Sequence, residues 1–299
     1  MNSSRFYLVK FIFILLMIFA VSNCGDFGRK EADFHKTPIF FIHAHGMKAE
    51  YWNPMIDYFR KKGYPENFLK SIQLLPATGS NIVAAESQIQ PAIESFLTEI
   101  NRNLKERNLE IPEKSKVDLI SHGMGALSAR WYTAQLRPER VRIWISLGGA
   151  NHGTNVLCTY FGKGAEECCP AFAKSIKQSM LQYILNGLPY LNDVDETPYG
   201  MGIDSEGVQS IKPDDEKHIF YFSVRTSTSK WIQPERSALL DGAGGIPVTL
   251  NVGLEIEETQ PGNFLIKTPI NHDGMSAYLK IHKLVESLID QTESYNPPE

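Results

Sequence analysis

A strand that runs directly into a glycine-centred turn and then a helix constrains this chain more than any other feature. Residues 117–120 form a short apolar run of strand character, and the turn Ser121-His122-Gly123-Met124-Gly125 follows at once. Residues 126–136 then continue as a predicted helix. This order has the form of a nucleophile elbow, a strained turn whose neighbours must be small. The residue at its centre is Gly123.

Predicted strands and helices alternate along most of the chain. Apolar runs of strand character occupy 38–42, 71–75, 141–147, 219–224 and 248–256, while helical spacing marks 49–62, 89–104 and 278–288. Such alternation predicts the α/β class, with a doubly wound, mainly parallel sheet and helices on both faces. Ligand sites in these sheets lie at the carboxyl ends of the strands. The stretch 151–216 interrupts the alternation and is predicted to be an insertion that caps the sheet.

The N-terminal residues predict export. Arg5 and Lys10 supply positive charge before an apolar run over 11–21, a pattern that is typical of a signal peptide. Cys24 follows small residues, as in a bacterial lipobox, although Val21 stands where Leu is usual. We expect a signal peptide at 1–23, lipidation of Cys24, a linker over 24–37, one domain at 38–292 and a polar tail at 293–299. A bacterial cell-envelope lipoprotein anchored to a membrane is the favoured location; ordinary signal cleavage and secretion is the alternative.

Charge and cysteine content narrow the remaining classes. The 299 residues carry a formal net charge of -4 without clustered Lys and Arg, so no nucleic-acid partner is predicted. Cys158 is expected to form a disulfide with Cys168 or Cys169, since exported proteins can keep disulfides. A zinc site is disfavoured because no His lies beside these cysteines. No metal and no cofactor are expected.

The elbow sequence resembles that of bacterial class 2 triacylglycerol lipases, which usually read Gly-His-Ser-Met-Gly at this point. The resemblance covers 38–289 and implies an α/β-hydrolase fold and carboxylic ester hydrolysis. It assigns the triad histidine to His272 and the oxyanion-hole N–H groups to His45 and Met124. Further matching segments are Phe41-Ile42-His43-Ala44-His45-Gly46, Gly149-Ala150-Asn151-His152-Gly153-Thr154, Asp195-Glu196-Thr197-Pro198, Ser237-Ala238-Leu239-Leu240-Asp241-Gly242-Ala243 and Asn271-His272-Asp273-Gly274.

Three positions depart from the family pattern. Gly123 stands at the nucleophile position and has no oxygen to attack an acyl carbon. Ser229 stands at the acid position when the segment is aligned on Ile232 and Pro234, and serine cannot hold an imidazolium by charge. Ala44 replaces a Gly that is usual in the family, and it is expected to crowd the oxyanion loop.

Three functions remain open from the sequence. The first is a catalytically inactive lipase-fold lipoprotein that binds a lipid or acyl chain in a cleft, to which Tyr160, Phe161 and Trp231 contribute. The second is an active triacylglycerol lipase or ester hydrolase with a displaced nucleophile such as Ser121, or with a metal-assisted water. The third is an interaction protein whose protein partner is unknown. Asp273 and Glu235 are weaker candidates for a substitute acid.

Overall fold

The computed structural model describes residues 30–160, 162–170, 179–186, 219–240, 243–244, 246, 248–249 and 255–295. The predicted signal peptide at 1–23, the lipidation site Cys24, Phe161, the segment 195–198 and Asp241 lie outside these residues. No helix in the described part of the chain is long and apolar enough to cross a membrane.

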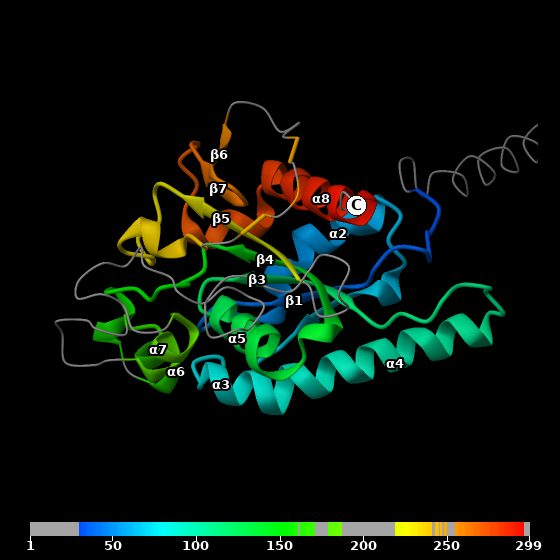
Figure 1. Ribbon diagram of the computed structural model, residues 1–299, viewed down its shortest axis with the longest axis horizontal. Coiled ribbons are helices and arrows are strands. Elements are labelled where there is room, and N and C mark those ends of the chain that lie inside the picture. Colours follow the sequence, from blue (N-terminus) through cyan, green and yellow to red (C-terminus); the bar gives the residue numbers. More distant parts are fainter. Residues whose placement is uncertain are drawn as a thin grey trace, which may run out of the picture.

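A seven-stranded sheet forms the centre of the molecule (Figure 1). Every neighbouring pair is parallel except the last, where β6 runs antiparallel to β7. Strands β1 and β3 are buried at every residue, as expected for strands of a parallel sheet that is covered on both faces. In spatial order the strands are β2 Leu69–Ile72, β1 Ile39–Ile42, β3 Val117–His122, β4 Val141–Leu147, β5 Phe220–Thr226, β7 Asn263–Ile266 and β6 Ile256–Gln260.

Helices cover both faces of this sheet. Figure 1 shows α2 and α8 on one face and α3, α4 and α5 on the other, with α6 and α7 lying beyond the end of α3. The predicted doubly wound α/β architecture is therefore confirmed. Among the described residues the α-helices are α2 Asn53–Lys61, α3 Asn81–Ala84, α4 Gln90–Glu106, α5 Gly125–Trp131, α6 Lys163–Glu167, α7 Met180–Asn186 and α8 Leu279–Ser294.

Some predicted elements lie elsewhere or take another form. The strand predicted at 71–75 is β2 Leu69–Ile72, and the helix predicted over 126–136 is α5 followed by a π-helical turn at Tyr132–Leu136. The strand predicted over 248–256 is wrong, because Val248 and Thr249 are not in a strand and β6 begins only at Ile256. Helix α8 continues to Ser294, beyond the predicted domain end at 292.

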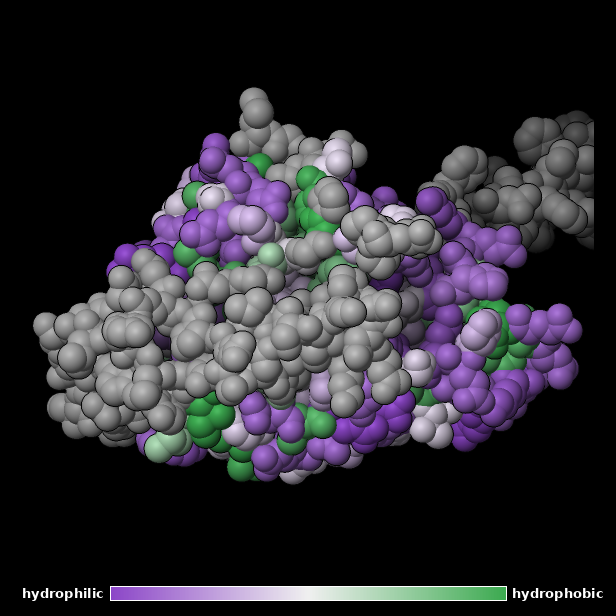
Figure 2. All heavy atoms as spheres, in the orientation of Figure 1, coloured by the Kyte–Doolittle hydropathy of each residue, from purple (hydrophilic) through white to green (hydrophobic). Residues whose placement is uncertain are grey.

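The described core has two parts. The larger part surrounds the sheet, and the smaller one lies between α5 and the described pieces of the insertion. On the face seen in Figure 2, hydrophobic side chains form small separate patches among hydrophilic ones where grey atoms do not cover them. The smaller part of the core includes Met124 of the turn after β3, so it supports the end of the sheet at which the predicted site lies. Its buried members are Met124, Leu127, Ala134, Ala150, Leu157, Cys168, Leu181, Leu185, Ile232 and Ala238.

Candidate functional site

The turn between β3 and α5 has the shape of the predicted elbow, with Gly123 at a positive φ of 55°. Its N–H donates to the carbonyl of Leu147 at 3.0 Å, and its carbonyl accepts from the N–H of Ala126 at 3.2 Å. The neighbouring Gly125 is required by space, because a Cβ there would lie 2.3 Å from the carbonyl oxygen of His43. The backbone of an elbow is thus present although the reactive side chain is not.

Gly123 has no room for a side chain. A Cβ at this position would lie 2.8 Å from the Cβ of Ala44 and 3.0 Å from Nε2 of His272. The first distance is shorter than real Cβ contacts, and a Cβ is bonded directly to the backbone, so neither Ala44 nor a new residue at 123 could rotate it away. The crowding that the sequence predicts for Ala44 therefore falls on the nucleophile position itself.

His272 lies where the triad histidine is expected, at the start of the 3₁₀ turn His272–Ala277. Its ring packs on the ring of His122 with centroids 4.3 Å apart, and its carbonyl accepts from Nε2 of His122 at 3.0 Å. Only 5% of the residue is exposed. Burial lowers the pKa of His272 to about 4, and the smaller opposing effect of Asp273 does not offset it. The imidazole is therefore neutral at pH 7.

Ser229, which the sequence assigns to the acid position, lies beside the imidazole of His272. Its Oγ lies 3.4 Å from Nδ1 of His272 and accepts from the N–H of Ile232 at 3.1 Å. The hydroxyl is buried and neutral, so it can exchange a hydrogen bond with the imidazole but cannot stabilise a positive charge on it by Coulomb attraction.

The two predicted oxyanion-hole residues lie side by side. Nδ1 of His45 is 3.0 Å from Sδ of Met124, which joins the loop after β1 to the elbow. Within the described residues, the backbone N–H groups of His45 and Met124 donate to no protein acceptor. Burial also lowers the pKa of the His45 ring. Both N–H groups remain available to an oxygen atom in the pocket beside them.

A pocket of about 220 Å³ opens at this point. Its polar end is formed by Gly123, His45, His272 and the exposed Asp273. The rest of its lining is mainly apolar and includes Trp231 and Tyr160, as predicted for a cleft; their rings lie 5.9 Å apart. The remaining lining residues are Ala44, Gly46, Met47, Met124, Leu157 and Ile232.

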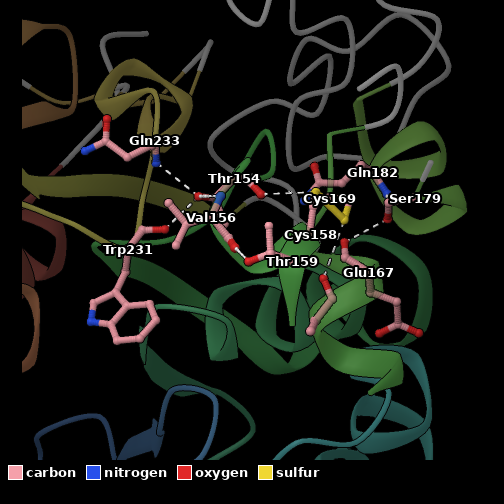
Figure 3. The surroundings of a disulfide bond; sticks show 11 residues. Thr154, Val156, Cys158, Thr159, Glu167, Cys169, Ser179, Gln182, Trp231 and Gln233 are labelled. Carbon is pink, nitrogen blue, oxygen red and sulfur yellow. Dashed lines mark hydrogen bonds between the residues drawn. A yellow bond between two sulfur atoms is a disulfide. The ribbon is translucent and has the colours of Figure 1, made fainter. Parts of the chain in front are cut away.

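A disulfide between Cys158 and Cys169 holds the apolar wall (Figure 3). This is one of the two predicted pairings; the other candidate, Cys168, is free and buried. Cys158 lies between the pocket residues Leu157 and Tyr160 in sequence. The bond therefore fixes the segment that supplies both of them.

Thr154 connects this wall to the opposite one. Its hydroxyl donates to the carbonyl of Trp231 at 2.6 Å and accepts from the N–H of Gln233 at 3.0 Å. Its N–H donates to the carbonyl of Cys168 at 2.7 Å. Figure 3 shows Thr154 between the Trp231 loop and the disulfide.

The other sequence candidates do not join the site. Ser121, the proposed displaced nucleophile, is fully buried outside the pocket lining and accepts from Nε1 of Trp144 at 2.9 Å. Glu235 pairs with Arg225 at 2.9 Å, so it is not a substitute acid for His272. Nε2 of His43 accepts from the N–H of Leu74 at 3.0 Å, a structural role. Within the described ranges, no three His, Cys, Asp or Glu side chains gather into a metal site.

Sequence reasoning missed Glu167. This carboxylate is buried and accepts from the hydroxyl of Ser80 at 2.6 Å and from Nδ2 of Asn81 at 3.0 Å, joining α6 to the start of α3. Glu167 ends α6, next to Cys168, and nothing in the surrounding sequence distinguishes it from an ordinary glutamate exposed to solvent.

Comparison with known proteins gives one family. The family model described as Lipase (class 2) matches residues 36–233, well over half of the chain. None of the curated proteins compared with the chain matches it.

Among solved structures, the mature form of Bacillus licheniformis lipase BlEst2 is 15% identical, with a TM-score of 0.42, over 66% of this chain and 69% of that lipase. The Listeria innocua lin2722 gene product is 12% identical over 88% of this chain and 96% of its own, at a TM-score of 0.41. Aspergillus fumigatus lipase B is 13% identical over 70% of this chain and 43% of its own, at a TM-score of 0.42. Likeness at these levels carries no information on ligand or substrate.

Proposed function

This chain belongs to the class 2 lipase family, and we propose that it is a member that binds acyl compounds without hydrolysing them. The observation that carries the proposal is the contact between Gly123, Ala44 and His272. No hydroxyl stands at the elbow, and the place of its β-carbon is crowded by the Ala44 methyl and the imidazole. Acyl transfer through a covalent intermediate needs that hydroxyl.

Binding is supported by what remains around the missing nucleophile. The pocket keeps a mainly apolar lining, and its polar end keeps two backbone N–H groups without protein acceptors among the described residues. Apolar walls with a few placed polar groups are typical of small-molecule sites. An acyl chain against Trp231 with its oxygen at the polar end fits this division.

The competing function is an ester hydrolase with a displaced nucleophile. Neither serine candidate in the described part of the chain is placed to act as that nucleophile. Ser121 is held by Trp144 and does not line the pocket. Ser229 lies at Nδ1 of His272, whereas the nitrogen that faces the elbow is Nε2. A serine at Nδ1 is on the wrong side of the ring to attack an ester held at the oxyanion hole.

The test measures chemistry and binding on the same protein. We expect no labelling by a fluorophosphonate probe and no turnover of p-nitrophenyl octanoate above a denatured control. We also expect saturable binding of octanoate by calorimetry, weakened about tenfold by Trp231→Ala, since loss of the aromatic wall costs about 1.4 kcal/mol.

Leu279→Ala is the matched control for this test, because Leu279 is an exposed apolar residue of α8 outside the pocket lining. Its octanoate affinity should equal that of the parent. Probe labelling that disappears in His272→Gln would overturn the inactive assignment, and equal octanoate binding by the parent and Trp231→Ala would overturn the binding site.

We also propose that the chain is exported and anchored through a lipid on Cys24. The residues before Cys24 support this through their signal-peptide pattern. Metabolic labelling with a palmitate analogue should mark the parent and not Cys24→Ser. Equal labelling of both would show that another residue carries the lipid, and labelling of neither would show that the chain is not lipidated.

A further inference from the structure

We propose that Ser229 holds His272 as the neutral tautomer that carries its hydrogen on Nε2, so that the polar end of the pocket offers N–H donors to an acyl oxygen. In a lipase triad the same nitrogen accepts a proton, because the acid on the other side of the ring fixes the opposite tautomer. This inference rests on the proposed function for the ligand, but its first half concerns the free protein alone.

The argument begins with the hydrogen of the Ser229 hydroxyl. Oγ already accepts from the N–H of Ile232 at 3.1 Å, and Nδ1 of His272 lies 3.4 Å away. Nδ1 is the acceptor within reach of this hydroxyl among the described residues. A buried hydroxyl hydrogen without an acceptor costs about 1–3 kcal/mol. Ser229 therefore donates to Nδ1.

The tautomer follows from this donation. A neutral imidazole has one N–H and one lone pair, so a ring that accepts at Nδ1 carries its hydrogen at Nε2. The buried ring of His272 is neutral at pH 7, as shown by its low pKa. An aspartate at position 229 could only accept, and it would move the hydrogen to Nδ1. The replacement of acid by hydroxyl thus changes what the opposite nitrogen presents to the pocket.

Nε2 faces the pocket without a partner. His272 is 95% buried, it lines the pocket, and no described residue bonds to Nε2. The backbone N–H groups of His45 and Met124 lie at the same end and also lack acceptors there. These three donors lie at one end of the pocket, where the carboxylate in the lining is that of the exposed Asp273. The matching ligand atom is an oxygen with lone pairs, either a carboxylate or an ester carbonyl.

Asp273 is the acidic residue of the pocket lining, and its charge influences where a ligand oxygen can bind. Asp273 is exposed, so water screens its charge. Its carboxylate therefore repels a ligand anion at the mouth of the pocket more than one at the buried N–H groups beside His272. A ligand oxygen is therefore placed beside His272, with the chain directed toward Trp231.

The tautomer is measured by nitrogen NMR on protein labelled at its histidines. The His272 signals are assigned by their absence in His272→Gln, which is necessary because the chain has eight histidines. We expect the hydrogen on Nε2 in the parent and on Nδ1 in Ser229→Asp. Ser229→Ala is the control that removes the hydroxyl without adding an acceptor, and it should lose the fixed preference. A parent ring with its hydrogen on Nδ1 overturns the proposal.

The ligand half is tested with three compounds that share an eight-carbon chain and differ in the head group. Octanoate and methyl octanoate both present an acceptor oxygen, whereas octylammonium presents only donors. We expect the ammonium to bind about tenfold or more weakly than either acyl compound, since donors without acceptors remain unpaired. The ratio of octanoate to methyl octanoate affinity then distinguishes a carboxylate site from a carbonyl site.

Failure of the two proposals is distinguishable. Equal binding of all three compounds would overturn the donor end and leave acyl binding intact. Absence of binding by all three would overturn the proposed function, while the NMR result on the free protein would still decide the tautomer.

Discussion

The two ends of the pocket are held in different ways. At the polar end, Ala44 and His272 lie so close to Gly123 that a β-carbon on Gly123 would clash with the Ala44 methyl. At the apolar end, Tyr160 is 45% exposed and belongs to a segment fixed by a disulfide and by Thr154. Steric fit determines the first end, and tethers between loops determine the second. The effects of substitutions at the polar end on stability and activity should therefore depend on one another. The effects of substitutions at the apolar end on ligand affinity should be additive.

The largest effect expected from this difference is a conditional gain of activity. Ala44→Gly, Gly123→Ser and Ser229→Asp together should raise turnover of p-nitrophenyl octanoate by on the order of 10³-fold over the parent, because nucleophile, acid and space return together. Gly123→Ser with Ser229→Asp alone should remain at least about tenfold below the triple variant, since the Ala44 methyl still blocks the serine. Equal rates for the two would show that Ala44 is no obstacle.

The coupling can also be measured as stability, without any chemistry. Gly123→Ala should lower the free energy of unfolding by about 4 kcal/mol, the sum of a positive φ for alanine and a methyl contact with Ala44. In an Ala44→Gly background the cost should fall by about 2 kcal/mol as the contact disappears. Chemical denaturation measures both.

Gly46→Ala is the matched control for this stability cycle. Gly46 has a φ of 69°, close to that of Gly123, but a Cβ there meets nothing within 4 Å. It should therefore show only the backbone cost, about 1–2 kcal/mol. If Gly123→Ala costs no more than Gly46→Ala, the polar end is not sterically closed.

At the apolar end, removing the disulfide should loosen a wall without disturbing the opposite end. Cys158→Ala with Cys169→Ala should lower the free energy of unfolding by about 3 kcal/mol, from the loop that the bond closes. Octanoate affinity should fall as well, while the His272 tautomer stays the same. Cys168→Ala controls for loss of a buried thiol and should leave octanoate affinity unchanged. A shifted His272 signal in the double variant would contradict the independence of the two ends.

The smallest effect belongs to the exposed ring beside Trp231. Tyr160→Ala should weaken octanoate binding by about threefold, because one partly exposed aromatic contact contributes about 0.5–1 kcal/mol. Combined with Trp231→Ala, the losses should add to within about twofold in affinity. Strong coupling between these two variants, measured by calorimetric titration with octanoate, would show that the apolar end also depends on close fit.

The sequence predicts the parts of this molecule that repeat a simple physical pattern. Strands β1 and β3 are buried at every residue; β1 is an unbroken apolar run, and β3 is apolar except at Asp118, Ser121 and His122. Strand β6 is short, carries Glu257 and Glu258 and is partly exposed, so its pattern is weak and the β6–β7 hairpin was not predicted.

Site prediction had a similar limit. The order of motifs locates Gly123, Ser229 and His272, because each follows a recognisable strand or turn. Spacing cannot choose between Cys168 and Cys169, which are adjacent and would close loops of almost equal length. The contact between Ala44 and Gly123 joins two loops, so it depends on the relative position of β1 and β3 and not on either segment alone.

The Ala44 methyl also sets the order of any mutational path that would place a serine at Gly123. A lineage that first gained a side chain at Gly123 would carry a destabilised protein, because the methyl would meet the new β-carbon. One that first reduced Ala44 to glycine would pass through a tolerated intermediate and could then accept the serine. Two substitutions that look independent in the sequence are thus accessible in only one succession, and the glycine at the elbow is protected against single mutations.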